Sequence, residues 1–173
     1  AASVDALKQA ILELAVSGGL SPADRWPQAP VALKSGASLQ NGYAFKSEWF
    51  AKDGIRLLRN INITHGSTDW SEGVCLPEKD AEPFSRFLLA EGDVVLTLDR
   101  PFISTGTKVA QIVASDLPAL LLQRVGRFQL SERLIPEYVL LWVNSPMFSK
   151  QIDPGRSNGV PHISTKQVEA AMI

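Results

Sequence analysis

The clearest pattern of apolar positions lies at the start of the chain, where they recur at steps of three, four, three and four residues. Val4, Leu7, Ile11, Leu14 and Gly18 follow this spacing. It predicts a short amphipathic helix with an a/d seam, and such a seam packs against a partner helix. Two heptads are too few for a stable coiled coil on their own. We therefore expect that this helix either docks on its own domain or forms one end of a longer assembly.

Glycines and then prolines mark the end of this helix. Gly18 and Gly19 supply a stop signal, and residues 21–30 contain three prolines but no apolar periodicity. The pattern divides the chain into a helix over residues 1–20, a linker over 21–30 and a domain over 31–173.

Between residues 31 and 129 the apolar runs are short and are separated by turns. The segments that resemble strands are residues 55–59, 61–64, 94–98, 108–113, 120–122 and 125–128. Because no regular long helices separate them, a doubly wound parallel sheet is disfavoured. The pattern predicts an α+β fold with a curved, partly antiparallel sheet that resembles a half-barrel.

The pattern becomes helical after residue 135. Pro136 stands at a favoured first-turn position, and a second helix is predicted to begin at Pro146. Ser164 and Gln167 have the spacing of a capping box at the start of a last helix. In the first of these helices, the residues predicted to share one face are Tyr138, Leu141, Trp142 and Ser145.

The composition is that of a globular protein, with 173 residues, 45% of them hydrophobic and 20% charged. No apolar run approaches the roughly 18 residues of a membrane span, and no basic-then-apolar leader begins the chain. The single cysteine, Cys75, excludes an internal disulfide and fits a reducing compartment. We expect a cytoplasmic protein without membrane contact, in which Cys75 is structural.

The formal net charge of −1 does not by itself indicate a nucleic-acid-binding protein, but its distribution is uneven. Residues 31–66 contain five basic and two acidic residues, residues 67–99 two and eight, and residues 100–127 four and one. If the fold brings the two basic segments together, they form a cationic face. The alternative interpretation is ordinary solvated charge.

Motifs that would indicate catalysis are missing from the sequence. Two histidines and one cysteine do not make a zinc-binding cluster. There is no glycine-rich phosphate loop, no Gly-x-Ser-x-Gly elbow and no Asn-Pro-Pro-Tyr motif for a flipped base. The Glu78–Asp80 stretch is more simply a solvated loop than a nuclease centre. We expect a non-catalytic chain that needs no cofactor and no metal.

The remaining polar residues suit recognition of double-stranded DNA. Arg or Lys contacts guanine and Asn or Gln contacts adenine in the major groove, while cations, hydroxyls and backbone N–H groups hold phosphates. Four segments carry such groups, at residues 40–47, 56–62, 99–108 and 155–164. The candidate DNA-binding residues are Lys46, Ser47, Arg56, Arg59, Asn60, Asn62, Arg100, Ser104, Thr105, Lys108, Arg156 and Asn158.

The first two segments each allow a structural interpretation. The aromatic residues of the first are more simply packing anchors. In the second, a plain strand would place Arg56 and Arg59 on opposite faces. It would also place Asn60 and Asn62 on one face, with Ile61 inward. Turn-capping amides and a structural arginine are the alternative.

The last two segments are loops, where readout residues tend to lie on a rigid scaffold. Asp99 can instead pair with Arg100 or hold its loop in place. A polar, glycine-flanked loop that runs into a capped helix is a ready contact for a phosphate or a base. His162, within that loop, is more often a packed or capping histidine than a reader.

Five stretches carry a resemblance to a known family. They are residues 7–20 with Leu-Lys-Gln-Ala-Ile-Leu and Gly-Gly-Leu, and residues 42–47, 54–63, 89–96 and 155–164. In order and spacing they resemble specificity subunits of type I restriction-modification enzymes. The first stretch resembles the end of the conserved helix, and the rest resembles the target-recognition domain that follows it.

This resemblance implies a non-catalytic role in sequence-specific DNA recognition. In the family, two recognition domains held apart by long antiparallel helices each read one half of a split target. The helices dock DNA adenine methyltransferase subunits, and a restriction subunit joins to cut. The implied partners are therefore DNA, these two kinds of subunit and a second copy or half of the specificity subunit. The helix predicted over residues 1–20 of this chain is too short to act as that spacer.

Two alternatives belong to other classes. An enzyme, such as a nuclease or a methyltransferase remnant, would need a carboxylate cluster or base pocket. A protein-interaction module would dock through Val4, Leu7, Ile11 and Leu14 without intrinsic DNA specificity. DNA affinity should fall steeply with added salt, whereas a packed interface should barely respond.

Overall fold

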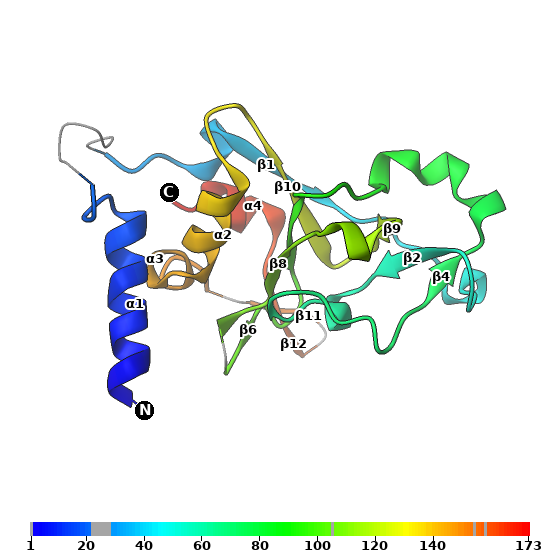
Figure 1. Cartoon of the computed structure of the whole chain (residues 1–173), viewed down its shortest axis with the longest axis horizontal. Helices are drawn as coiled ribbons and strands as arrows, with labels where there is room; N and C mark the ends of the chain where they lie inside the picture. Colours follow the sequence, from blue (N-terminus) through cyan, green and yellow to red (C-terminus); the bar gives the residue numbers. More distant parts are fainter. Residues whose placement is uncertain (1, 22–28, 105, 154, 158) are drawn as a thin grey trace.

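The helices gather at one end of the molecule and the small sheets extend toward the other (Figure 1). The computed structural model of the chain describes residues 2–21, 29–104, 106–153, 155–157 and 159–173, with residues 2, 3, 5, 156 and 157 described by their backbone alone. Most of the linker predicted over 21–30 lies outside these residues. The helices are α1 (Ala2–Val16), α2 (Pro136–Asn144), α3 (Pro146–Ser149) and α4 (Thr165–Ala170).

A five-stranded sheet forms the centre, in the order β1-β10-β5-β8-β3. All its pairings are antiparallel except that of β3 with β8, which is parallel. Its strands are β1 (Ala37–Asn41), β3 (His65–Gly66), β5 (Val94–Thr97), β8 (Val109–Gln111) and β10 (Val125–Leu130).

A three-stranded sheet lies beyond it, in the order β4-β2-β9. Its central strand pairs antiparallel with β4 and parallel with β9. The strands are β2 (Ile55–Leu58), β4 (Cys75–Leu76) and β9 (Ala119–Leu121). Two hairpins complete the set: β6 (Phe102–Ile103) with β7 (Gly106–Thr107), and β11 (Gly155–Ser157) with β12 (Val160–His162). The predicted α+β class with an open, partly antiparallel sheet is confirmed.

Six short 3₁₀ turns connect these strands within the described residues. They are η2 (Leu33–Ser35), η3 (Ser47–Trp49), η4 (Asn60–Asn62), η5 (Glu78–Asp80), η6 (Glu82–Phe87) and η7 (Ala114–Asp116).

Two hydrophobic cores lie on opposite faces of the central sheet. Alternate residues of β5 point to opposite faces, so Val94 packs with the helices around Trp142. Val95 packs in the other core with Leu121 of the second sheet. Because both faces are covered, all four β5 residues are buried. This doubly packed sheet is a rigid base for the loops at its ends.

Two predicted elements were wrong in detail. Residues 61–64 are not a strand: η4 occupies Asn60–Asn62, with Ile61 47% exposed and Asn62 1% exposed. The Asn62 amide accepts the backbone N–H of Arg59, which closes a tight turn instead of extending the chain. On α2 the buried positions are Val139, Trp142 and Val143, whereas Leu141 is exposed.

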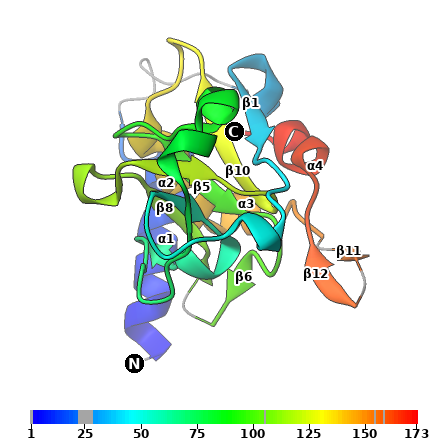
Figure 2. The same cartoon turned by 90° about the vertical axis from the view of Figure 1, so that its right-hand side faces the viewer.

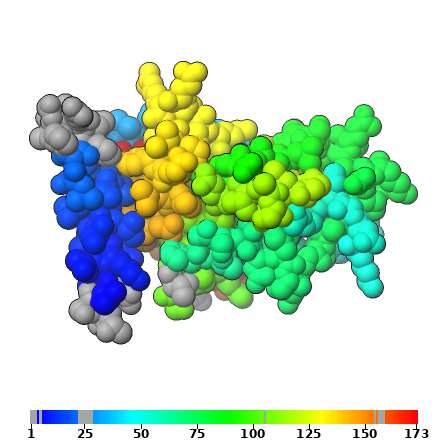
Figure 3. Space-filling view, in the orientation of Figure 1, coloured from blue at the N-terminus to red at the C-terminus, as the bar shows by residue number. Residues whose placement is uncertain are grey.

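The N-terminal helix docks through residues other than its seam. Val16 is buried against α2 and α3, and its carbonyl accepts the Tyr138 hydroxyl at 2.9 Å. Glu13 pairs with Lys150 at 2.7 Å. The seam residues Val4, Leu7, Ile11 and Leu14 are all exposed. Figure 3 shows α1 forming one end of the molecular surface.

Candidate nucleic-acid interface

Three loop segments that are distant in sequence meet on one side of the central sheet. We call the described residues of these segments, 59–66, 98–104, 106–108, 155–157 and 159–163, together the hairpin face. Figures 1 and 2 both place β6, β11 and β12 near one another. The backbone N–H of Arg100 donates to Pro161 O at 2.8 Å, and that of Ile163 donates to Leu98 O at 2.9 Å. These bonds join the base of one hairpin to the other.

The 59–66 segment is fastened to the same hairpin. β3 pairs in parallel with β8, and His65 Nδ1 lies 3.2 Å from Thr107 O. The Lys108 ammonium donates to the Asn60 carbonyl. A Cβ on Gly106, whose φ is +136°, would lie 2.5 Å from the His65 ring. Only glycine therefore allows the hairpin to pack this closely on His65.

Asp99 joins three segments of this region. Its Oδ1 lies 2.7 Å from His162 Nδ1 and 2.9 Å from an Arg124 guanidinium nitrogen. Arg124 lies in the turn between β9 and β10, and in the sequence it stands out only as one of the four basic residues of 100–127. The partner of Asp99 is therefore not Arg100, its neighbour in sequence. Only the fold could show this, because 25 residues separate Asp99 from Arg124.

The structure excludes Asn62 from the DNA contacts predicted in residues 56–62. Its amide oxygen accepts Arg59 N at 3.2 Å and its amide nitrogen donates to Asp69 O at 2.9 Å. A side chain with 1% exposure and these internal bonds is not available to a base. Arg59 reaches both Asn62 and the Glu72 carbonyl.

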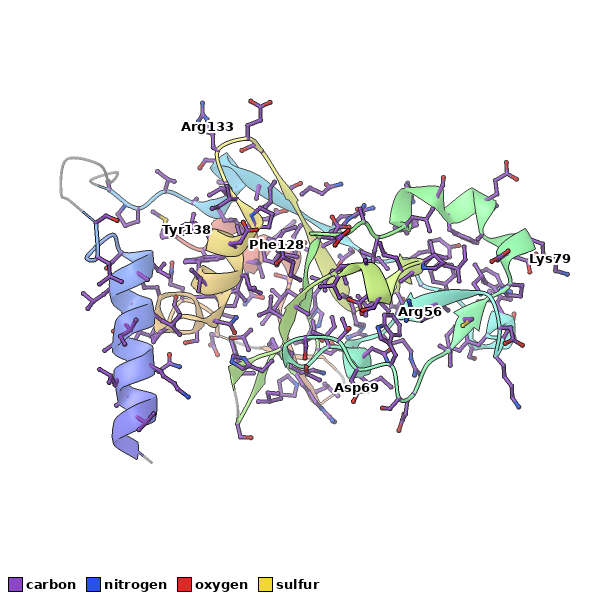
Figure 4. All side chains as sticks on the ribbon, in the orientation of Figure 1. Arg56, Asp69, Lys79, Phe128, Arg133 and Tyr138 are labelled. Atoms are coloured by element: carbon purple, nitrogen blue, oxygen red, sulfur yellow. The ribbon has the colours of Figure 1, made fainter. Side chains whose placement is uncertain are left out.

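Arg56 has structural partners. Its guanidinium stacks over the Trp70 ring at 4.7 Å and donates to Ser115 O at 2.8 Å and Leu117 O at 3.0 Å. These contacts fit the structural interpretation of Arg56. Figure 4 shows Arg56 over the second sheet.

Arg100 and Lys108 lie at the base of the β6–β7 hairpin, and Ser104 lies at its tip. Arg100 and Ser104 are exposed. Burial lowers the pKa of Lys108, and the charge of Arg100 lowers it further. The described part of this hairpin thus carries an exposed guanidinium and an exposed hydroxyl, while the Lys108 ammonium is bound at the η4 turn. Thr105 and Asn158 lie outside the described residues, and Arg156 is described by its backbone alone.

Lys46 and Ser47 are not brought into this group. They lie at η3, and residues of η3 share a cavity wall with Leu76, Lys79 and Phe84. Figure 4 shows Lys79 at the end of the molecule opposite α1. Lys46 is exposed and lies 3.6 Å from Glu48. Three of the four predicted DNA-binding segments therefore contribute to the hairpin face, and the fourth, residues 40–47, lies apart from them.

Much of the predicted basic surface is neutralised internally. Arg127 pairs with Asp93 at 3.0 Å and donates to Gln40 Oε1 at 2.6 Å. With Arg124 paired to Asp99, two of the four basic residues in 100–127 have carboxylate partners. The cationic face is therefore narrower than the charge count predicts.

No group of three or more His, Cys, Asp or Glu residues could hold a metal ion within the part of the chain that the structure describes. No described helix has the length and apolar character needed to cross a membrane. Cys75 is buried, and burial raises the pKa of its thiol.

Comparison with known proteins finds a relative that matches nearly the whole chain. It is 42% identical to the type I restriction enzyme EcoAI specificity subunit of Escherichia coli, over 99% of this chain and 37% of that protein. By sequence, the chain belongs to the type I specificity-subunit family. It is also 33% identical to the MjaVIII specificity subunit of Methanocaldococcus jannaschii over 70% of this chain. No family model matches it.

Solved structures of type I specificity subunits and assemblies share the fold. The HsdS subunit from Thermoanaerobacter tengcongensis aligns with a TM-score of 0.53 at 14% identity, over 98% of this chain and 40% of that one. A chain from a structure of a type I R-M system, described for its complex assembly and conformational transition, aligns with a TM-score of 0.57 at 15% identity. The chain spans well under half the length of the curated relatives it matches.

Proposed function

We propose that this chain is a target-recognition domain that reads one half of a split DNA sequence and catalyses no reaction. The observation that carries the proposal is the match, over 99% of the chain, to a relative named as a specificity subunit. The geometry supports a location for the reading surface. Loops held on a doubly packed sheet are the usual position for recognition residues.

We place the DNA contacts on the hairpin face. Arg100 and Ser104 are exposed at the hairpin and can reach base edges in the major groove. Lys108 and Arg59 have internal carbonyl partners at the base of the same loops. This position suits contact with phosphates, which fix register without reading sequence.

The partners follow from the family and from α1. We propose that DNA methyltransferase subunits and a restriction subunit assemble with the complete specificity subunit. The exposed seam of α1 supports packing against a further helix of that assembly. It also supports the second candidate function, a module that docks through α1 without reading DNA.

The deciding experiment uses the complete specificity subunit with its methyltransferase subunits. The complex is bound to a random duplex pool at two salt concentrations, and the enriched sequences are determined. We expect a split sequence, one half of which changes when this domain is exchanged for that of another specificity subunit. Salt-insensitive assembly through α1 without sequence enrichment would favour the docking module.

A single substitution tests the location. In the same complex, Arg100→Ala should weaken binding to the selected duplex by about 1–3 kcal/mol and leave random duplex unchanged. Arg133→Ala is the matched control, because Arg133 is exposed on the side opposite Asp69 and the hairpin face (Figure 4). Equal losses from both variants would contradict this location.

A further inference from the structure

Asp99 connects the two hairpins through its carboxylate. One oxygen, Oδ1, lies within hydrogen-bonding distance of both His162 on β12 and Arg124 in the β9–β10 turn. The Asp99 side chain is only 16% exposed, whereas His162 and Arg124 are 29% and 37% exposed. We call these three residues the Asp99 clasp. It joins the entry of the β6–β7 hairpin to the exit of the β11–β12 hairpin.

The backbone around the clasp sets the geometry of this pair. Asp99 and His162 form an antiparallel bridge. The bonds from Arg100 N to Pro161 O and from Ile163 N to Leu98 O lie on either side of it. This pattern makes Asp99 and His162 a non-hydrogen-bonded pair, in which facing side chains come closest. Leu98 N also donates to Arg124 O at 2.8 Å.

Unusual backbone conformations flank the clasp. Among the described residues, the non-glycine positions with positive φ are Arg100 at +47° and Arg124 at +70°. Arg100 follows Asp99 directly and Arg124 is its ion-pair partner. Such conformations persist where the surroundings over-determine them, and they cluster at functional sites. Their coincidence at one carboxylate indicates that this junction is held in a particular geometry.

We propose that Asp99 is a positioning residue for DNA readout, which holds the two hairpins at a fixed spacing so that they form one reading surface. This inference rests on the proposed function. Readout needs side chains held within a fraction of an ångström of their productive position. A hairpin of two or three residues per strand is marginal alone and needs external support to keep such a position.

The clasp is not required for the hydrophobic cores. The two cores contain neither Asp99 nor its partners, and partly exposed ion pairs contribute little to global stability. Loss of the clasp should therefore alter discrimination between DNA sequences more than it alters unfolding. That separation distinguishes a positioning role from a structural one.

The test uses Asp99→Asn in the complete specificity subunit with its methyltransferase subunits. We expect the Kd for the selected duplex to rise about ten- to a hundredfold. The Kd for random duplex and the unfolding midpoint should stay as in the wild type. Asp93→Asn is the matched control, since Asp93 also pairs with an arginine, at 3.0 Å from Arg127, away from the hairpins. It should keep full discrimination.

A disulfide between positions 99 and 162 should restore the discrimination that is lost with the Asp99 clasp. Facing residues in a non-hydrogen-bonded pair have Cα atoms about 4.5 Å apart, which is within the range that a disulfide spans. The double variant Asp99→Cys, His162→Cys should lose discrimination when reduced and regain it when oxidised. The native Cys75 is buried and should not compete.

The outcomes are distinguishable. Wild-type discrimination in Asp99→Asn would overturn the clasp and leave the proposed function intact. A parallel fall in unfolding midpoint and in binding to both duplexes would show Asp99 to be structural, and would also overturn it. Absence of any sequence preference in the wild-type complex would overturn the proposed function itself.

Discussion

At the scale of single residues, Asp116 shows how one buried carboxylate holds a loop. It accepts hydrogen bonds from the Thr68 hydroxyl at 2.6 Å, the Trp70 indole at 2.8 Å and the Val113 backbone N–H at 2.9 Å. Burial alone would raise the pKa of Asp116, but these bonds outweigh it and hold the pKa below its ordinary value. The carboxylate thus ties the 68–70 loop to η7.

Asp116 should make the stability of the chain depend on pH in the acid range. Because its pKa is lower in the folded than in the unfolded state, its contribution is full above about pH 4 and is lost as the pH falls through the folded pKa. Urea unfolding between about pH 2 and 6 should show this loss. Asp116→Asn should be less stable at neutral pH and should show a shallower decline on acidification.

The control for this prediction is Asp69→Asn. The backbone and side chain of Ser71 lower the pKa of Asp69, but that carboxylate is exposed at its loop. Its replacement should leave most of the acid dependence in place. A pH profile of Asp116→Asn identical to that of the wild type would contradict the assignment.

At the scale of elements, α1 has one face packed on the domain and one exposed apolar face. Its last turn belongs to the helical core through Val16, while its seam faces away from that core. An isolated helix of this length is marginal in water, so the contacts of Val16, Glu13 and Tyr138 hold it in place. Docking of α1 on its own domain and the proposed packing of its seam against a partner helix therefore use different residues.

Substitutions on the two faces of α1 should have different effects. Leu7→Lys with Ile11→Lys should change the unfolding free energy of the chain by less than about 0.5 kcal/mol, because both residues are exposed. The same pair should abolish packing of α1 against further helices of the complete assembly. Amide hydrogen exchange and co-purification with the methyltransferase subunits measure the two effects.

Val16→Asp is the comparison for that pair. It should release α1 from α2 and α3, and hydrogen exchange along α1 should accelerate. Faster exchange from the seam substitutions as well would contradict the separation of the two faces.

The start of α4 depends on a capping box that the sequence predicts. Ser164 accepts the backbone N–H of Gln167 at 3.2 Å, and the Gln167 side chain accepts Ser164 N at 2.8 Å. Ser164→Ala should lower the unfolding free energy by about 1 kcal/mol, measured by urea unfolding. Lys166→Ala, at an exposed position of the same helix, should leave it nearly unchanged.

At the scale of the whole molecule, the predicted cationic surface is reduced, because Arg124 and Arg127, two of the four basic residues of 100–127, have carboxylate partners. The overall charge of −1 also limits non-specific attraction to DNA. We therefore expect affinity to come from a few phosphate contacts and from the remainder of the assembly. Each contact still releases counterions when it forms.

Lys108→Ala, introduced into the complete complex, tests whether phosphate contacts from the hairpin face contribute to DNA affinity. It should weaken binding to the selected and the random duplex alike, and it should reduce the slope of log Kd against log salt by about one. Fluorescence anisotropy between about 50 and 200 mM salt measures both quantities. A loss confined to the selected duplex would make Lys108 a reader of bases instead.

Local periodicity and turn chemistry were readable in the chain because they depend on near neighbours. They predicted the N-terminal helix, the capping box at Ser164 and Gln167, and the open α+β sheet, and the structure confirms these elements. The strand predicted over residues 61–64 was wrong. Alternation of apolar and polar residues over only four positions is a weak signal, and the Asn62 side chain instead closes a turn by accepting the backbone N–H of Arg59. The candidate DNA contacts stay predictions.

The kinds of elements, the family and the residue types suited to recognition can all be read from the chain without its fold. Which of them meet depends on packing: the described residues of 59–66, 98–108 and 155–163 lie on one face, Lys46 lies elsewhere, and Asn62 is buried. The cause is that contacts such as those of Asp99 with Arg124 and His162 join residues 25 and 63 positions apart. Such contacts arise from the way the sheets and hairpins pack, and no local pattern encodes them.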